Sequence, residues 1–225
     1  MYLRILCVTV LLFLFAALPA TAQQYIGAIG GASVSNLDVS DAEDEMNTRT
    51  GFGVGGLFQV GMGQNVALRF EPMYVQKGAE QDLSEQTGVE NAQARFNLSY
   101  LEVPVFFKIN IPAGNLQPYA LAGPTIGFNL NSELELETET VSATAAIEGP
   151  TRTIDAGLGF GGGLNVPIGG QSFFVEGRYI FGLVDIIDDR TVAVGDQQAD
   201  VGGEVRNRGW QFMGGLMIPL EGGYR

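Results

Sequence analysis

The sequence has no histidine and only one cysteine, Cys7, among its 225 residues. Without histidine it cannot build a Ser-His-Asp or Cys-His catalytic set, a histidine-ligated zinc site or a haem held by a proximal histidine. Basic residues are also scarce, because 12 Lys and Arg stand against 25 Asp and Glu and give a formal net charge of −13. Nucleic-acid affinity comes mainly from Lys and Arg on phosphates, so this balance argues against a nucleic-acid partner.

The N-terminus predicts a signal peptide at 1–22 that is cleaved before the mature domain, 23–225. Arg4 supplies a short positive start, and an uncharged, mostly apolar run follows at 5–18. Small residues then give the pattern that signal peptidase reads. The apolar run is shorter than the ~20 residues that a membrane-spanning helix needs. An uncleaved N-terminal anchor is the alternative.

The rest of the chain has no run of ~18 apolar residues, so no further membrane helix is expected. Instead, runs of 10 to 15 residues rich in Val, Ile, Phe, Tyr and Gly recur, and many alternate apolar with polar residues as strands do. A transmembrane strand needs ~9–11 residues, which all these runs reach. Eight runs can be counted, at 25–34, 51–60, 66–76, 97–110, 116–130, 153–166, 172–184 and 210–220.

The connections between the runs alternate in length. Three of them have five residues each and carry no charge, at 61–65, 111–115 and 167–171. The other four have 16, 20, 22 and 25 residues, at 35–50, 77–96, 131–152 and 185–209, and contain 20 of the 25 acids. Short turns at one end and long loops at the other are typical of an outer-membrane barrel. We therefore predict an all-β fold, an eight-stranded antiparallel up-and-down transmembrane β-barrel located in the cell outer membrane.

Charged residues within the runs fall on the face opposite the apolar stripe, which would direct them into the lumen. Side chains just fill the interior of an eight-stranded barrel. Charges there must pair, because an unpaired buried charge is costly. The predicted lumen charge network has one acid more than it has bases, and consists of Arg69, Lys108 and Arg178 with Glu71, Glu102, Asp155 and Glu176. This balance favours a closed lumen over the alternative, a path for protons or small ions.

Five segments of the chain resemble motifs of the PorT-type outer-membrane β-barrel family. They are 70–78 (FEPMYVQKG), 100–108 (YLEVPVFFK), 118–124 (PYALAGP), 175–179 (VEGRY) and 182–183 (GL). The resemblance implies an eight-stranded barrel in the outer membrane of a Gram-negative bacterium. It also implies a family whose named member assists a secretion system and whose other members mostly have no assigned activity.

Two charged patterns outside the strand runs are candidate binding features. Bases at the roots of the long loops predict a ring that pairs with lipopolysaccharide phosphates, formed by Arg49, Lys77, Arg95, Arg152, Arg206 and Arg208. Interfacial snorkelling is the alternative for these side chains. Four glutamates alternate along one extended segment and form a weak candidate patch for divalent cations, at Glu133, Glu135, Glu137 and Glu139.

The sequence thus predicts a non-enzymatic barrel with four long acidic extracellular loops and no cofactor. Its expected roles are envelope structure, surface interaction with protein partners, or assistance to a secretion complex. Its expected partners are outer-membrane lipid and lipopolysaccharide. The first alternative is a narrow porin-like channel, and the second is a soluble β-barrel that binds a lipophilic ligand.

Overall fold

A computed structural model describes residues 23–39, 47–84, 92–113, 116–138, 142–146, 152–186, 191–194, 197–200 and 205–220. The predicted signal peptide, 1–22, lies outside the described residues. The strands are β1 (Gln24–Val39), β2 (Asn47–Gly61), β3 (Val66–Phe70), β4 (Met73–Asp82), β5 (Gln93–Asn110), β6 (Gln117–Glu137), β7 (Ser142–Ala146), β8 (Ile154–Ile168), β9 (Gln171–Gly182), β10 (Thr191–Val194), β11 (Gln197–Asp200) and β12 (Val205–Pro219).

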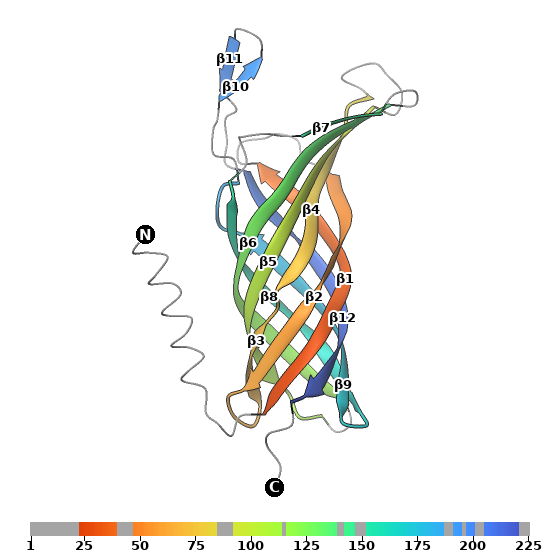
Figure 1. The fold of residues 1–225 in the computed structure, drawn as a ribbon, viewed down its shortest axis with the longest axis vertical. Coiled ribbons are helices and arrows are strands. Elements are labelled where there is room, and N and C mark those ends of the chain that lie inside the picture. Colours follow the sequence, from red (N-terminus) through yellow and green to blue (C-terminus); the bar gives the residue numbers. More distant parts are fainter. Residues whose placement is uncertain are drawn as a thin grey trace, which may run out of the picture.

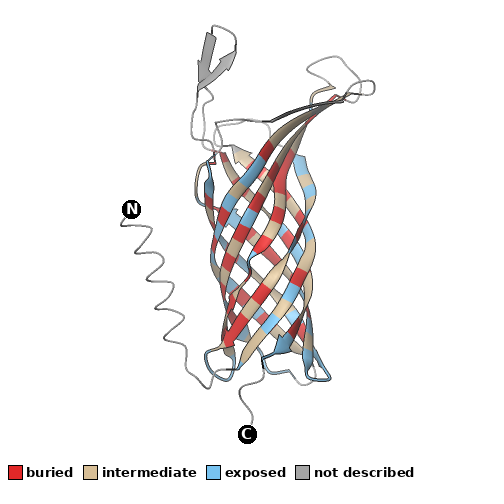
Figure 2. Cartoon of the chain, viewed as in Figure 1, coloured by how far each residue is buried: buried red, intermediate tan, exposed pale blue. Residues whose placement is uncertain are grey.

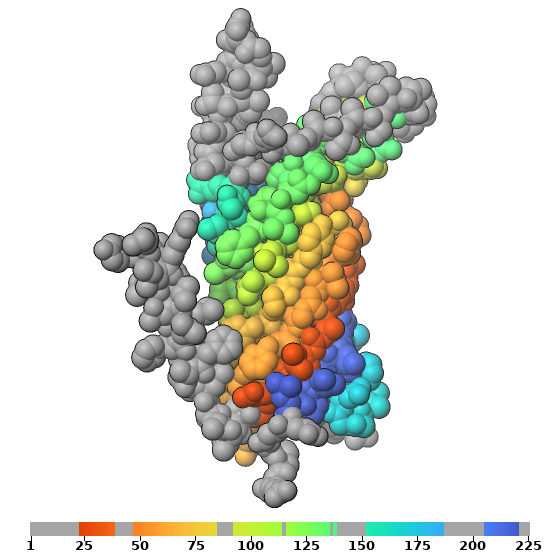
Figure 3. All heavy atoms as spheres, viewed as in Figure 1, coloured from red at the N-terminus to blue at the C-terminus, as the bar shows by residue number. Residues whose placement is uncertain are grey.

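The described strands other than β7, β10 and β11 form a closed antiparallel barrel (Figure 1), and β10 pairs with β11 in a separate two-stranded sheet. β1 pairs with β2 on one side and with β12 on the other, so the first and last strands close the cylinder. The N-terminal strands, red and orange, lie against the blue C-terminal strand on the outer surface (Figure 3). Around the wall the order is β1, β2, β3 with β4, β5, β6, β8, β9 and β12, which gives eight positions. The predicted eight-stranded up-and-down barrel is confirmed.

β3 and β4 share one position in the wall, interrupted at Pro72. Proline has no backbone N–H, so it cannot donate to the ladder. The register is the same on both sides of the interruption. Phe58 of β2 pairs with Phe70, and Gly55, three residues earlier in β2, pairs with Met73, three residues after Phe70. The two segments therefore act as a single strand of the barrel.

Several strands run past their predicted ends. β5 has 18 residues and β6 has 21, and the pairing of β6 with β7 extends this hairpin beyond the barrel (Figure 1). All four predicted loops, 35–50, 77–96, 131–152 and 185–209, are therefore too long, at the ends that border β1, β2, β4, β5, β6 and β12. A strand above the membrane needs no apolar outer face, because paired neighbours hold it. Its length is consequently invisible to a search for apolar alternation.

The predicted short connections lie at the opposite end of the barrel, where the wall turns tightly. Between β8 and β9 the turn consists of Gly169 and Gly170, whose φ angles are 59° and 89°. A two-residue hairpin needs positive φ at such positions, and glycine adopts it without steric penalty. The predicted connection 167–171 is therefore shorter than expected, since β8 and β9 extend into it.

The wall separates an apolar outside from an interior that holds the charged side chains together with a buried apolar cluster. Exposed and buried residues alternate along its strands (Figure 2). Large apolar side chains cover the outside: Phe107, Ile109 and Val175 are 53%, 55% and 60% exposed. An aromatic group joins them, with the Tyr179 and Trp210 rings 5.2 Å apart between centroids. Such an outer surface is suited to lipid. Within the residues described, no helical segment is long and apolar enough to cross a membrane.

Gly78 on β4 occupies a point where the wall leaves no room for a side chain. Its φ is 142°, and an added Cβ would collide with the carbonyl oxygen of Phe96 on β5. The Ser35 hydroxyl donates to the Gly78 carbonyl at 3.1 Å and accepts from the Gly78 N–H at 2.9 Å. These bonds connect β1 to β4, the two strands that flank β2 in the wall, and hold Gly78 in place.

Replacing this glycine tests the packing of the wall. We expect Gly78→Ala to lower the free energy of unfolding by about 1–3 kcal/mol, because the residue would be both strained and crowded. Gly56→Ala is the control, since an added Cβ there meets no atom closer than 3.8 Å. The readout is the temperature at which the compact band of the unboiled protein disappears on electrophoresis. Equal midpoints for the two variants would contradict the interpretation.

Candidate functional site

Four charged side chains form a ring of ion pairs across the middle of the lumen. Arg69 and Glu71 come from the β3–β4 strand, and Glu176 and Arg178 come from β9, four positions away in the eight-position wall. Arg69 Nη1 lies 2.7 Å from Glu176 Oε2 and 3.2 Å from Glu71 Oε1. Arg178 Nη1 pairs with Glu71 Oε2 and lies 3.1 Å from Glu176 Oε1. All four side chains are fully buried, so this central ring joins opposite walls.

Neutral groups take part in the bonding of both guanidinium groups, while Arg69 Nη2 is buried without a hydrogen-bond partner among the described residues. Arg69 Nε donates to Gln59 Oε1 on β2 at 3.3 Å, and Arg178 Nε donates to Gln211 Oε1 on β12 at 2.7 Å. Arg178 Nη2 also contacts the sulfur of Met73 at 3.1 Å. Such secondary partners matter because each satisfied donor lowers the free-energy cost of burying the charge.

Aromatic side chains pack against the same ring. The Tyr119 hydroxyl donates to Glu176 Oε2 at 2.7 Å. The guanidinium carbon of Arg69 lies 4.9 Å from the centroid of the Phe174 ring, and that of Arg178 lies 5.2 Å from the centroid of the Phe106 ring. These contacts fill the space beside the charges with apolar surface and favour the cations through the ring faces.

A second group of charges lies nearer the loop end, around Lys77. The Lys77 ammonium pairs with Glu102 and lies 3.6 Å from Asp155 Oδ2, and it sits 5.1 Å from the Tyr100 ring centroid. Asn207 Nδ2 donates to Asp155 Oδ2 at 2.9 Å. All these side chains are buried. The prediction that Lys77 belongs to the lipopolysaccharide ring is therefore wrong.

Lys77 also supplies the base that the predicted lumen charge network lacked. Among the described residues the interior now has four bases and four acids, because Lys77 joins Arg69, Lys108 and Arg178. Its position follows from the period of the strand, since it shares the odd-numbered inward face of Arg69 and Glu71. Sequence reasoning missed it because the strand was ended at residue 76.

Lys108 on β5 is buried but is held by amides. Its ammonium donates to Asn165 Oδ1 at 3.1 Å and to Gln59 Oε1 at 3.5 Å, and it lies 3.8 Å from the Tyr119 ring centroid. In the part of the chain that the structure describes, no carboxylate lies within 4.0 Å of it. Six of the seven predicted lumen charges therefore lie in ion pairs. The seventh, Lys108, lies one layer nearer the turns.

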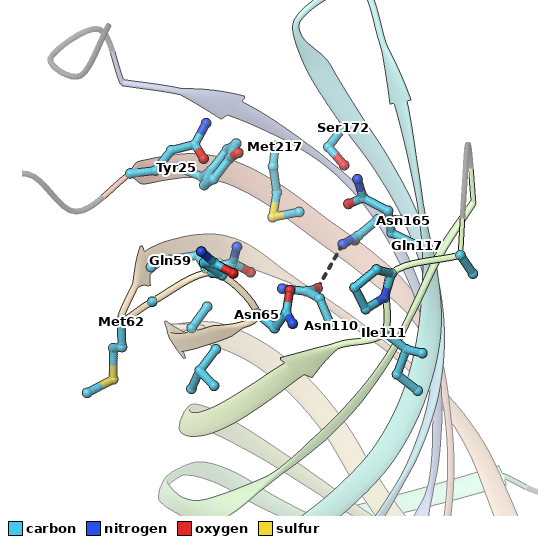
Figure 4. A pocket seen from close by; sticks show the side chains of 18 residues that line it. Tyr25, Gln59, Met62, Asn65, Asn110, Ile111, Gln117, Asn165, Ser172 and Met217 are labelled. Carbon is cyan, nitrogen blue, oxygen red and sulfur yellow. Dashed lines mark hydrogen bonds between the residues drawn. The ribbon is translucent and has the colours of Figure 1, made fainter.

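The two ends of the lumen differ in chemistry. At the loop end an apolar cluster occupies the interior, formed by Leu37, Ala79, Leu98, Tyr100, Ile186 and Val205. Ile186, which follows β9, is held there because its N–H donates to Val205 O at 2.9 Å and its carbonyl accepts from Arg152 N at 2.7 Å. At the turn end the lumen opens into a cavity of about 730 Å³ lined by uncharged residues (Figure 4).

The other predicted ring bases remain near the loop end but differ in their surroundings. Arg95 lies in the β5 extension, 3.6 Å from Glu80 and paired with Glu137. Arg49 donates to the Lys77 carbonyl at 3.2 Å, and Arg208 pairs with Asp38. Two further bases complete the set: Arg152, which is exposed, and Arg206, which is half-buried.

The predicted cation patch lies on β6 as an extended segment, as expected, up to Glu137, and Glu139 lies outside the described residues. Its glutamates bond to neighbouring side chains: Asn131 Nδ2 donates to Glu133 Oε1 at 2.8 Å, and Asn97 Nδ2 donates to Glu135 Oε2 at 3.4 Å. No group of three or more metal-ligating side chains is found among the described residues.

Closed β-strands, an apolar outer face and a charge-paired interior define the class of an outer-membrane β-barrel protein. Residues 21–188 match the model of the family described as outer membrane protein beta-barrel domain, and the chain belongs to this family. The protein is accordingly located in the outer membrane, which excludes the soluble-barrel alternative. No curated protein matches the chain at a significant level.

Solved structures of other barrels resemble this one. The outer membrane protein OprG of Pseudomonas aeruginosa superposes with a TM-score of 0.52 at 13% identity, over 89% of this chain and 97% of that chain. Neisserial surface protein A, NspA, gives a TM-score of 0.46 at 13% identity, over 87% of this chain and 96% of that chain. The likeness to OprG supports the fold and carries nothing about activity.

The placement of Lys77 can be tested against that of Arg95. We expect Lys77→Met to lower the free energy of unfolding by about 3–5 kcal/mol, because it leaves Glu102 and Asp155 buried without their cation. Arg95→Met removes a partly exposed ion pair, whose contribution is about 1 kcal/mol or less. Unfolding in urea, followed by loss of the compact electrophoretic band, compares the two. Equal losses would show that Lys77 is solvated like an interfacial base.

Proposed function

We propose that the protein is a non-enzymatic barrel with a sealed lumen, whose biological contacts are made at its surface. The central ring of Arg69, Glu71, Glu176 and Arg178 is the observation that carries this proposal. It joins opposite walls, and its side chains are fully buried. A solute that passed would have to separate these pairs and leave charges in a space too narrow to hydrate them.

Two further layers support the seal. The Lys77 group adds a second set of ion pairs towards the loops, and the apolar cluster around Ile186 lies beyond it. A hydrated ion would meet charge pairs first and then apolar surface, neither of which replaces its water. The narrow channel predicted as the first alternative requires these layers to part.

The outer surface is where partners would act. Most of the acids belong to the segments that connect the strands at the loop end, and the β5–β6 hairpin carries Glu133, Glu135 and Glu137 beyond the barrel. Envelope structure, surface interaction or assistance to a secretion complex are the roles that fit such a barrel. The resemblance to the PorT-type family favours the last of them.

Conductance across a planar lipid bilayer tests the seal. We expect the wild-type barrel to give no current steps above the lipid background, because the central ring fills the lumen. The double variant Glu71→Ala/Arg178→Ala removes two ring members on opposite walls, and should admit small ions if it still gives the compact electrophoretic band. Steady ohmic currents through the wild-type protein would contradict a sealed lumen and favour the channel.

We also propose that Arg206 and Arg208 contact lipopolysaccharide phosphates at the outer leaflet. On β12 they alternate with the buried Val205 and Asn207, so they face outward. Trp210 follows on the same face and is 49% exposed, as an interfacial aromatic residue would be. Arg208 pairs with Asp38, but a guanidinium has five N–H donors and can serve a phosphate as well.

Charge reversal tests whether Arg206 and Arg208, unlike Arg95 of the predicted ring, bind lipopolysaccharide. We expect Arg206→Glu/Arg208→Glu to retain less lipopolysaccharide through purification than the wild type, because phosphate would be repelled. Arg95→Glu is the control, since Arg95 lies in the β5 extension, opposite the part of β6 that also pairs with β7 beyond the barrel. The measure is lipopolysaccharide per mole of folded barrel. Retention that is unchanged in the double variant would refute the contact.

A further inference from the structure

The open cavity at the turn end has a chemical character of its own. Its wall carries carboxamides, including Gln59, Asn65, Asn110, Gln117 and Asn165, and none of its lining residues is charged. Figure 4 shows several of these amides facing the same space. A volume of about 730 Å³ lies in the range of pockets for small molecules. In a chain with a formal net charge of −13, the absence of a carboxylate among the described residues that line this mouth is chemically distinctive.

The buried ammonium of Lys108 fixes which way two of these amides point. An ammonium group only donates hydrogen bonds, so the amide atom that faces it must be an oxygen. Gln59 Oε1 and Asn165 Oδ1 are those atoms, at 3.5 and 3.1 Å. Gln59 Oε1 also accepts from Arg69 Nε, a second donor-only group. The NH₂ end of Gln59 is therefore the end turned away from the cations.

The same polarity passes from Asn165 to the next amide. Asn165 Nδ2 donates to Asn110 Oδ1 at 3.4 Å, the bond drawn in Figure 4. The oxygen of Asn110 is thereby used, and its NH₂ group is the free end of the chain Lys108–Asn165–Asn110. Among the described residues, neither Gln59 Nε2 nor Asn110 Nδ2 has a protein acceptor. The floor of the cavity thus presents N–H donors above the buried Lys108 side chain.

We propose that this cavity binds a small monoanionic carboxylate through the amide N–H groups of Gln59 and Asn110, which lie above the buried Lys108 side chain. A carboxylate accepts hydrogen bonds through both oxygens and donates none, which complements a floor of donors. Phosphates are usually held by direct Arg or Lys contacts, and no such residue lines the cavity. Short turns face the periplasm in outer-membrane barrels, so the ligand would arrive from that side.

This site goes beyond the sealed-barrel function and can fail independently of it. The cavity lies on the turn side of the central ring, and Lys108 with its amides lies between them. A barrel that conducts ions could still bind a carboxylate at its mouth, and a sealed barrel could leave its mouth empty. Conductance and ligand binding therefore report on different claims.

The test uses the full barrel in detergent micelles, with its Asn and Gln side-chain amides labelled with nitrogen-15. N-acetylalanine is the carboxylate probe, its N-methylamide is the neutral matched probe, and inorganic phosphate is the third. We expect N-acetylalanine alone to shift the Gln59 and Asn110 amide resonances in a saturable way. Asn110→Asp, nearly isosteric but negative, should weaken that binding about tenfold or more through like-charge repulsion.

Matched variants keep the result interpretable. Gln81→Glu adds the same charge on β4 at the opposite end of the barrel, and should leave the affinity unchanged. Lys108→Met removes the donor that orients Gln59 and Asn165 and should weaken the shifts; if it does not fold, Asn110→Asp still decides the question. Equal shifts with the neutral amide, tighter binding of phosphate, no saturable shift, or unchanged binding by Asn110→Asp would each overturn the carboxylate site.

Discussion

Charges that face a lumen too narrow for bulk water must find their partners on the opposite wall, and the barrel is organised around this constraint. Arg69 and Glu71 meet Glu176 and Arg178 across four wall positions. These charges disfavour any register other than the native one, because a slip by one residue would turn them towards lipid at a high cost in free energy. The central ring thus specifies the closure of the barrel as well as the filling of its interior.

The chemistry at each end of the lumen follows from the charged groups that the central ring does not pair. Towards the loops, Glu102 and Asp155 require a cation, and Lys77 meets them before the apolar cluster closes the interior. Towards the turns, Glu71 and Glu176 are paired with arginines, and Glu176 also accepts from Tyr119. Lys108 therefore donates to amide oxygens. Among the described residues, the interior therefore passes from an apolar layer through a charge-paired layer to a layer of neutral amides, which borders the open cavity.

The fold was predictable because lipid imposes a strict rule on the outer face. Apolar residues at every second position, such as Leu101, Phe107 and Ile109, indicate the strands, and the alternating loop lengths indicate the barrel. The rule stops at the membrane boundary, so the ends of β4, β5 and β6 could not be predicted from hydrophobicity. Lys77 was misplaced for this reason, although its odd-numbered spacing from Arg69 placed it inside.

Neutral polar residues were the other gap. Gln59, Asn165 and Gln211 lie inside the barrel, yet nothing in their own chemistry distinguishes a lumen amide from a surface amide. Their importance comes from the cations that they face, and those contacts join residues from different strands. Alternation alone places them on the inward face, but only the three-dimensional arrangement shows which amide meets which charge.

Cysteine accessibility in the folded protein tests the sealed lumen most directly. The chain has a single cysteine, Cys7, so a mature barrel without it can carry one introduced cysteine at a time. Ser172→Cys places a thiol in the open cavity, and Ser33→Cys places one beside Lys77, beyond the central ring. A small charged thiol reagent applied to barrels in lipid vesicles should modify the first readily and the second only after unfolding. Equal rates at the two positions would show that water and ions pass the ring, and would contradict the account.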